Sequence, residues 1–219
     1  MKKPVLKENE TCLYTYSEGL TDEVFHYCPG CTHGIIHKLV AECLVEMGLQ
    51  DKAIGVCPVG CSVLAYKYFN CDMYEAAHGR APAVATGAKR VHPDKFVFTY
   101  QGDGDLASIG TAEIVHAAHR GEKISTIFVN NAIYGMTGGQ MAPTTLIGQV
   151  TTTSPYGRDE DWSGKPLRIS EMLATIDGAK FVERVSVDTP ANIRRAKRAI
   201  KECFQLKLDN KGFGTVSYT

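Results

Sequence analysis

The stretch that decides the fold is KFVFTYQGDGD, residues 95–105. Its first six residues are rich in aromatic and β-branched side chains, which is typical of a buried strand, and the strand is expected to stop at Gly102. Helical spacing follows over residues 106–120, closed by Gly121. A strand that enters a helix through glycines brings free backbone N–H groups close to an anion, so we expect a phosphate-binding site here.

Strand and helix signals alternate along the rest of the chain. Strands are expected at 53–59, 95–100, 124–129, 180–187 and 212–219, and helices at 33–47, 81–89, 106–120, 169–176 and from Pro190 onward. This alternation predicts an α/β fold with a mostly parallel sheet and helices on both faces. We expect one domain over residues 1–219, with an N-terminal arm at about 1–27 and a long functional loop over 134–166.

Composition narrows the class of protein. Hydrophobic residues make up 44% of the 219 residues and charged residues 22%, which is the balance of a globular chain with a core. The 24 basic and 24 acidic residues cancel, which argues against an electrostatic nucleic-acid binder. No run approaches the ~20 apolar residues of a membrane helix, and no signal peptide is visible. We therefore expect a cytoplasmic location and no nucleic-acid or membrane partner.

A pair of asparagines follows the next strand. Residues 105–129, 25 in all, separate Gly104 from Asn130, which leaves room for one helix, a turn and one strand. Asp103 and Asn131 should therefore stand at the tips of two adjacent strands. A carboxylate, an amide oxygen, a backbone carbonyl and phosphate oxygens would complete an octahedron around Mg²⁺. A lone GDG is more often a tight turn, so the diphosphate and metal hypothesis depends on its pairing with the asparagines.

The eight cysteines need a second explanation. Cys28-Pro29-Gly30-Cys31 is a C-x-x-C before a helix, and this pattern alone fits a redox dithiol, a zinc site or an iron–sulfur cluster. Cys57 and Cys61 are spaced C-x₃-C, which is less typical of zinc. Cys43 and Cys203 lie on apolar helix faces and are expected in the core. His26, His33 and His37 are expected to be solvated rather than metal-binding.

The motifs together resemble a known family. CPGCTHG, VGCS (59–62), HGRAPAVATGAK (78–89), GDGD and NNAIYGMTGGQMAPTT (130–145) occur in the order seen in β subunits of 2-oxoacid:ferredoxin oxidoreductases. The resemblance covers nearly all of the chain from residue 20 onward. It implies the thiamine-diphosphate-binding fold, with thiamine diphosphate, Mg²⁺ and a [4Fe–4S] cluster as cofactors.

The resemblance also implies roles for individual residues. Asp103, Asn131 and the Ile133 carbonyl would bind Mg²⁺, and Cys28, Cys31 and Cys61 would bind the cluster. His78 and Arg80 would act near the reacting centre. The remaining cofactor contacts implied are Val59, Gly60, Cys61, Ser62, Gly104, Asp105, Gly135 and Met136. Cys57 and Cys71 receive no role.

The chain departs from the family in one respect. The fourth cluster cysteine of the family lies just after the last strand, and this sequence stops at Thr219 within an expected strand. Cys203, on a helix face, is a poor substitute. We therefore expect that the C-terminus is truncated.

The implied activity is oxidative decarboxylation of a 2-oxo acid with coenzyme A to acyl-CoA, carbon dioxide and reduced ferredoxin, a reaction of anaerobic metabolism. The substrate would be a branched-chain 2-oxo acid or 2-oxoglutarate. A chain of 219 residues has no room for the pyrimidine-binding domain, so a partner α subunit, and further small subunits, are expected in a heteromer. Two alternatives remain: a non-oxidative thiamine-diphosphate decarboxylase subunit, and a zinc-stapled scaffold subunit without catalysis.

Overall fold

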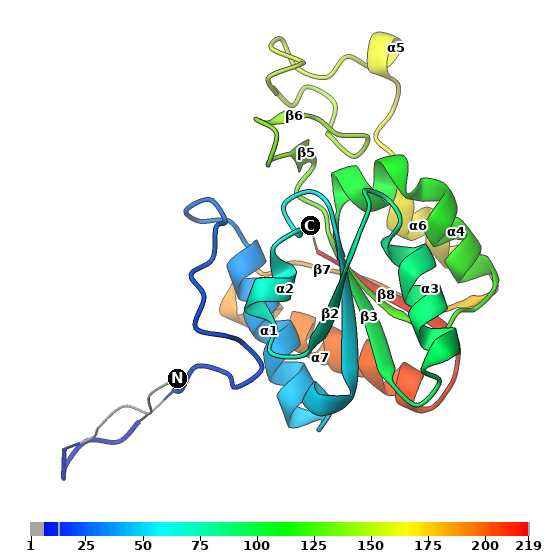
Figure 1. Ribbon diagram of the computed structural model, residues 1–219. Coiled ribbons are helices and arrows are strands. Elements are labelled where there is room, and N and C mark those ends of the chain that lie inside the picture. Colours follow the sequence, from blue (N-terminus) through cyan, green and yellow to red (C-terminus); the bar gives the residue numbers. More distant parts are fainter. Residues whose placement is uncertain (1–6, 13, 219) are drawn as a thin grey trace.

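A six-stranded parallel sheet forms the centre of the molecule (Figure 1). The structure is a computed structural model that describes residues 7–12 and 14–218. The strands run in the order β2-β1-β3-β4-β8-β7, and every pairing between them is parallel. Their bounds are β1 Ala53–Pro58, β2 Asp72–Ala76, β3 Phe96–Gly102, β4 Ser125–Val129, β7 Ala179–Val185 and β8 Phe213–Tyr218.

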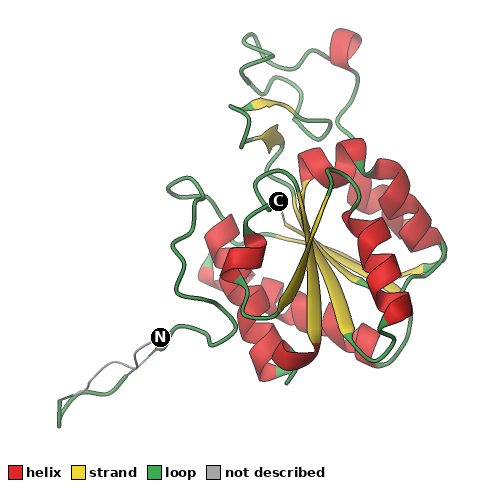
Figure 2. Ribbon diagram, in the orientation of Figure 1, coloured by secondary structure: helices red, strands yellow, loops and turns green. Residues whose placement is uncertain are grey.

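Helices cover both faces of this sheet (Figure 2). One hydrophobic core contains α1 (His33–Glu46) and α7 (Pro190–Leu208), and the other contains α3 (Ala81–Val91), α4 (Thr111–His119) and α6 (Ile169–Ala174). The central strand β3 serves both cores, because successive side chains of a strand point to opposite faces. Phe96, Phe98 and Tyr100 pack on the first core, while Val97 packs on the second. The predicted α/β fold is therefore confirmed.

Local signals explain where several elements begin. Thr189 caps α7, since its side chain accepts a hydrogen bond from the Asn192 N–H, and Pro190 occupies the first turn as the sequence predicted. Cys43 and Cys203 are buried in the core, which confirms their expected structural role. Short helices complete the list: 3₁₀ turn Gln50–Lys52 and α2 Ala65–Tyr68.

Three expectations about elements were wrong in detail. The edge strand β2 was not predicted, because it is mostly exposed and its sequence DMYEA has no apolar run. The helix expected over 106–120 is divided, with a π-helical turn at Asp105–Ile109 before Gly110 and α4 after it. The loop expected over 134–166 contains a small hairpin, β5 Ile133–Tyr134 with β6 Gln140–Met141, and the short helix α5, Glu160–Ser163.

This long loop stands beyond the carboxyl ends of the strands, at the top of Figure 1. It is the segment that encloses the polar residues at the tips of β3 and β4. Among the described residues no helix combines the length and the apolar character needed to cross a membrane.

The buried Lys207 gives the fold a measurable pH dependence. Burial lowers the pKa of Lys207 to about 8, although its ammonium donates to the Gly212 carbonyl. Between about pH 8 and 10.5 the unfolded chain keeps a proton at this lysine that the folded chain has lost, so the contribution of Lys207 to the free energy of unfolding should rise with pH in this window. Burial raises the pKa of the Cys43, Cys57 and Cys71 thiols, which act in the opposite direction, so the contribution of Lys207 is measured as a difference between the wild type and a lysine variant. The gain should be roughly 3 kcal/mol, at about 1.4 kcal/mol for each tenfold change in proton affinity.

We therefore predict that the free energy of unfolding of Lys207→Met falls relative to that of the wild type as the pH rises through this window, because the variant lacks this contribution. The measurement is the free energy of unfolding by urea at pH 7.5 and at about pH 10, compared between the wild type and the variant. The same substitution at the exposed Lys52 is the control and should leave the pH dependence intact. A parallel pH dependence in Lys207→Met and the wild type would contradict the prediction.

Candidate active site at the carboxyl ends of β1, β3 and β4

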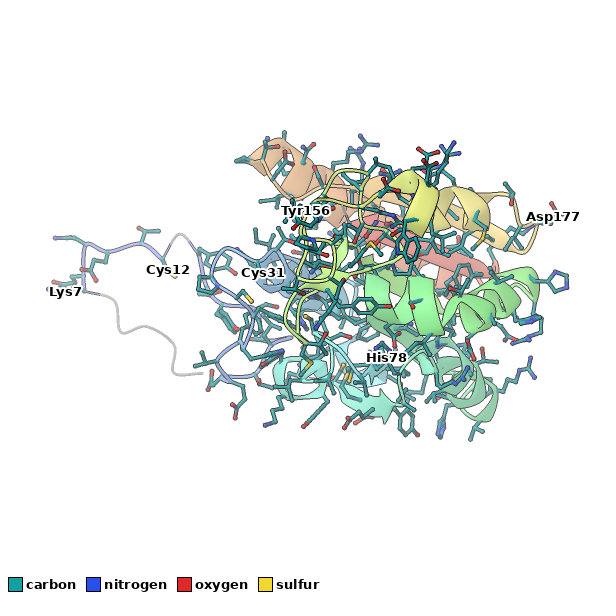
Figure 3. All side chains as sticks on the ribbon, turned by 90° about the horizontal axis from the view of Figure 1, so that it is seen from above. Lys7, Cys12, Cys31, His78, Tyr156 and Asp177 are labelled. Carbon is teal, nitrogen blue, oxygen red and sulfur yellow. The ribbon has the colours of Figure 1, made fainter. Side chains whose placement is uncertain are left out.

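A cavity of about 100 Å³ opens where β1, β3 and β4 end. Its walls come from the loops after these strands, and the long loop forms part of its rim. Figure 3 looks down on this end of the sheet, with Cys31, His78 and Tyr156 marking three of the loops that surround it. Twelve of the residues implied by the sequence line the cavity: Val59, Gly60, Cys61, Ser62, His78, Asp103, Gly104, Asp105, Asn131, Ile133, Gly135 and Met136.

Three oxygen-bearing groups meet at one side of this cavity. The side-chain oxygen of Asn131 lies 3.2 Å from Asp103 Oδ1 and 3.0 Å from the backbone oxygen of Ile133. Mg²⁺ binds oxygen at about 2.1 Å, so neighbouring ligands of an octahedron stand about 3 Å apart. Turned over, the amide would instead donate its N–H groups to both oxygens, which is the arrangement expected without a cation. The three predicted metal ligands thus converge with spacings that fit Mg²⁺.

Asp103 is held in place from several directions. Its side chain is 2% exposed, Thr144 Oγ1 donates to Oδ2 at 2.7 Å, and the Gly104 N–H donates to Oδ1 at 2.9 Å. Burial raises the pKa of Asp103, and these hydrogen bonds act in the opposite direction. A buried carboxylate of this kind gains from a bound cation, which would replace the lost solvation.

The turn that carries the other two ligands is strained. Ala132, between Asn131 and Ile133, has a φ of 61°, in the left-handed region that a residue with a Cβ avoids. The carbonyl of Ala132 accepts a hydrogen bond from Thr145 Oγ1 at 2.6 Å, with Gln149 Nε2 at 3.5 Å. The long loop therefore holds the turn in the shape that keeps the Ile133 carbonyl 3.0 Å from the Asn131 side chain.

Asp105 holds the loop after β2. Its Oδ1 accepts from His78 Nδ1 at 2.7 Å and from the Gly79 N–H, and its Oδ2 accepts from Gln101 Nε2 at 2.6 Å. Burial raises the pKa of Asp105. Bonding at Nδ1 leaves Nε2 of His78 as the nitrogen that can exchange a proton in the cavity. Arg80 behaves differently: it pairs with Glu113 on α4 and does not line the cavity.

Glycine at position 104 is required by close packing. A Cβ at Gly104 would overlap the ring of Tyr134, and one at Gly135 would stand 3.4 Å from Cys61 Sγ. Gly104 therefore packs against Tyr134, and Gly135 packs against Cys61. Both glycines are among the cofactor contacts that the resemblance implies.

The cysteines of the expected cluster are brought to the same region but not into one ligand set. Cys61 lines the cavity, and its pKa is raised by burial, then by the nearby thiols of Cys31 and Cys28, while the Met136 N–H lowers it. Cys28 is exposed, and Cys31 is partly buried in a turn closed by its own N–H to the Cys28 carbonyl at 3.0 Å. In the part of the chain that the structure describes, no three His, Cys, Asp or Glu side chains are arranged to hold a metal ion.

The expectation that His33 and His37 are solvated was wrong. Both are buried, whereas His26 is exposed. His33 lines the cavity, stacks on Tyr27 at 4.4 Å between ring centroids, and bonds through Nδ1 to the Tyr100 hydroxyl at 2.8 Å. Burial lowers the pKa of His33 to about 4, so it is neutral.

Other residues of the site were also missed by sequence reasoning. Tyr134 and Thr137 line the cavity, and Thr144 donates to Asp103, a predicted metal ligand. The sequence signal for them was the motif NNAIYGMTGGQMAPTT, which contains all three residues but gave none of them a role.

Comparison with known proteins identifies the family. The model of the thiamine pyrophosphate enzymes, C-terminal TPP-binding domain, matches residues 58–216. The chain belongs to this family. The comparisons therefore support three cofactors. Thiamine diphosphate and Mg²⁺ fit the family of thiamine pyrophosphate enzymes, and a [4Fe–4S] cluster fits the ferredoxin oxidoreductases among the similar proteins.

Individual relatives agree with the resemblance stated from the motifs. The ketoisovalerate oxidoreductase subunit VorA of Methanothermobacter thermautotrophicus is 50% identical over 99% of this chain and 46% of its own length. The 2-oxoglutarate synthase subunit KorB of Methanocaldococcus jannaschii is 38% identical over 80% of this chain and 64% of its own. The chain thus spans about half the length of the VorA relative.

A solved structure agrees as well. The 2-oxoglutarate:ferredoxin oxidoreductase of Magnetococcus marinus, with 2-oxoglutarate, coenzyme A and succinyl-CoA bound, matches with a TM-score of 0.80 and 28% identity, over 91% of this chain and 65% of that one. The resemblance and the predicted thiamine-diphosphate-binding fold are confirmed.

We predict that Asp103→Ala abolishes retention of thiamine diphosphate and Mg²⁺ while the fold survives. The variant loses the charged ligand and leaves the Thr144 hydroxyl and the Gly104 N–H without this acceptor, so a cooperative melting transition of the cofactor-free variant is the check that the fold survives. Thiamine diphosphate and magnesium content after gel filtration are the readouts, with the exposed Asp94→Ala as the control. Wild-type affinity in Asp103→Ala would show that the diphosphate and metal lie elsewhere.

Proposed function

We propose that this chain is the thiamine-diphosphate-binding β subunit of a 2-oxoacid:ferredoxin oxidoreductase, which decarboxylates a 2-oxo acid with coenzyme A and passes the electrons to ferredoxin. The observation that carries the proposal is the position of Cys61. Its thiol packs on Gly135 and lines the same cavity as Asp103 and Asn131. A non-oxidative decarboxylase would need the metal site but no thiol ligand beside it.

The proposed cluster site uses Cys28, Cys31 and Cys61. The two thiols of the C-x-x-C turn are near enough to affect the pKa of Cys61, and closing of the exposed turn would bring the three sulfurs onto one cluster. Cluster assembly supplies the free energy for such closing, because each thiolate–iron bond forms only in the folded site. The fourth ligand is not assigned among the described residues.

The proposed roles of the other residues follow from their contacts. Asp103, Asn131 and the Ile133 carbonyl would hold Mg²⁺ and, through it, the diphosphate, while the π-helical turn after Gly104 would offer backbone N–H groups. Bound thiamine diphosphate supplies the carbanion chemistry that releases carbon dioxide. His78, oriented by Asp105, would hold or move a proton at Nε2. Arg80, bound to Glu113, is better placed to fix the start of α3 than to touch substrate.

The substrate we propose is a branched-chain 2-oxo acid of the 2-oxoisovalerate type, with 2-oxoglutarate as the second choice. The support is the higher identity to the ketoisovalerate oxidoreductase subunit, 50%, than to the 2-oxoglutarate synthase subunit, 38%. We also propose a cytoplasmic location, since all eight cysteines are free thiols.

We further propose that residues 1–219 form a single diphosphate-and-metal domain, and that a pyrimidine-domain subunit covers the cavity. Ligand pockets usually enclose about 300–1,000 Å³, so the cavity of about 100 Å³ can surround only part of a cofactor. Apolar side chains stand exposed on the long loop, with Tyr156 100% exposed and Trp162 91% exposed. Exposed aromatic residues of this kind mark a protein–protein interface.

We predict a brown protein after anaerobic purification, with broad absorbance near ~400 nm from the cluster. Cys61→Ser should lose most of the iron and sulfide but keep thiamine diphosphate, because the metal ligands of the diphosphate remain. Cys12→Ser, in the N-terminal arm, is the matched control and should keep iron at the wild-type level. Zinc without iron in the wild type would support the scaffold alternative instead, and a colourless protein holding thiamine diphosphate would support the non-oxidative one.

We also predict that turnover requires the partner. The purified chain should not oxidise 2-oxo acids with coenzyme A and ferredoxin, and a pyrimidine-domain subunit should restore activity. Replacing Tyr156 and Trp162 by serine should weaken the subunit association without changing the melting temperature of the chain, since both are exposed. Replacing the exposed Tyr66, far from the loop in sequence, serves as the control. Full turnover by this chain alone would refute the requirement.

A further inference from the structure

A buried arginine without a carboxylate partner lies inside the long loop. Arg158 is 5% exposed, and its side chain forms no ion pair with any residue that the structure describes. A guanidinium removed from water must recover its hydration from other polar groups. Arg158 does so with backbone carbonyls.

Six carbonyl oxygens lie within hydrogen-bonding distance of this one side chain, which has five N–H groups, so one N–H of Nη1 is shared between two acceptors. Nη1 donates to the first group, and Nε and Nη2 donate to the second. The acceptors and distances are Ala142 (3.2 Å), Pro143 (2.9 Å) and Thr145 (2.9 Å) for the first group, and Gly164 (3.0 Å), Ser163 (3.0 Å) and Lys165 (3.1 Å) for the second. Arg158 therefore joins residues 142–145 to residues 163–165.

The first of these segments carries the hydroxyls that orient the metal ligands. Thr144 donates to Asp103 Oδ2 at 2.7 Å, and Thr145 donates to the carbonyl of Ala132 at 2.6 Å. Neighbouring carbonyls of the same segment are the ones bound by Arg158. The segment 142–145 therefore connects the Arg158 guanidinium both to Asp103 and to the turn at Ala132.

We propose that Arg158 is a positioning residue for the Mg²⁺–diphosphate site, acting through Thr144 and Thr145 and touching neither metal nor cofactor. The inference rests on the proposed metal site and adds a residue that neither the motifs nor the comparisons assign. The planar guanidinium donates in several directions at fixed angles, whereas a lysine ammonium has three donors at one point and cannot reach both segments.

The strained turn explains why such positioning is needed. Ala132 has a φ of 61°, which persists only where the surroundings enforce it. Without Arg158, three carbonyl oxygens of the segment 142–145 would lose the guanidinium that donates to all of them. Thr145 would then no longer hold the Ala132 carbonyl in place. The turn would then relax and carry the Ile133 carbonyl away from the Asn131 side chain.

The experiment measures Mn²⁺ binding, in place of Mg²⁺, by the electron paramagnetic resonance of free Mn²⁺, on the full chain with thiamine diphosphate present. Arg158→Ala should weaken Mn²⁺ binding by about 10–100-fold, the usual effect of losing a residue that orients a metal ligand. Methylguanidinium at low, non-denaturing concentration should restore part of the affinity in Arg158→Ala. The exposed Arg194→Ala is the control and should bind Mn²⁺ as the wild type does.

A double-mutant cycle distinguishes positioning from general support of the fold. Thr144→Val removes the hydroxyl on Asp103, and its effect on Mn²⁺ affinity should be much smaller in the Arg158→Ala background than in the wild type. Additive effects, or wild-type affinity in Arg158→Ala, would overturn the proposal. If Arg158→Ala does not fold, Arg158→Lys provides the test: it should fold and bind Mn²⁺ weakly, and unchanged affinity would overturn the proposal.

The outcome is separable from that of the proposed function. A wild-type chain that binds Mn²⁺ and thiamine diphosphate but shows no ferredoxin-linked activity with its partner would contradict the proposed reaction alone. A wild-type chain that binds no Mn²⁺ would overturn both the metal site and the role of Arg158.

Discussion

The parallel pairing of β3 with β4 is the constraint on which the site depends. Its register places Gly102 opposite Val129, so the two chains leave the sheet at the same level and Asp103 and Asn131 emerge side by side. On the other side of β4, the Asn130 N–H donates to the Tyr218 carbonyl at 2.8 Å, which extends the ladder up to the asparagine pair. A slip by one residue would move one ligand by about 3.3 Å and turn its side chain to the opposite face.

The unliganded site is held in an unfavourable state by its surroundings. The carboxylate of Asp103 is buried, and the non-glycine residue Ala132 adopts a left-handed backbone conformation. Each of these features costs free energy when no cation is present. The cost falls on the apo state, so part of it is recovered when Mg²⁺ and diphosphate bind. The hydrogen bonds from Thr144 and Thr145 keep this arrangement from relaxing.

The predictable parts of this protein are those with local signals. Short runs of consecutive residues predict the strand before GDGD, the strand before Asn130 and the cap at Thr189. The alternation of strands and helices along the chain predicts the parallel sheet. The edge strand β2 was not predicted because its mostly exposed residues show no apolar pattern. The burial of His33 was not predicted because it depends on Tyr100, which lies 67 residues away in sequence. The composition of a histidine-bearing segment cannot show such a distant partner.

The interior of the long loop was unpredictable for the same reason, with a larger consequence. Gly, Pro, Thr and Ser predict irregular structure, and such a loop would ordinarily be mobile. Here a single cation, the Arg158 guanidinium, placed among carbonyl oxygens takes the place of a hydrophobic core, because the large apolar side chains of the loop are mostly exposed. Charge–dipole bonds of this kind are directional and lose strength when any acceptor moves. The loop is therefore tied together by hydrogen bonds where it contacts Asp103 and Ala132, although aromatic side chains such as Tyr156 and Trp162 remain on its outer surface. One segment can thus orient the metal site from within and present a surface to another subunit from without.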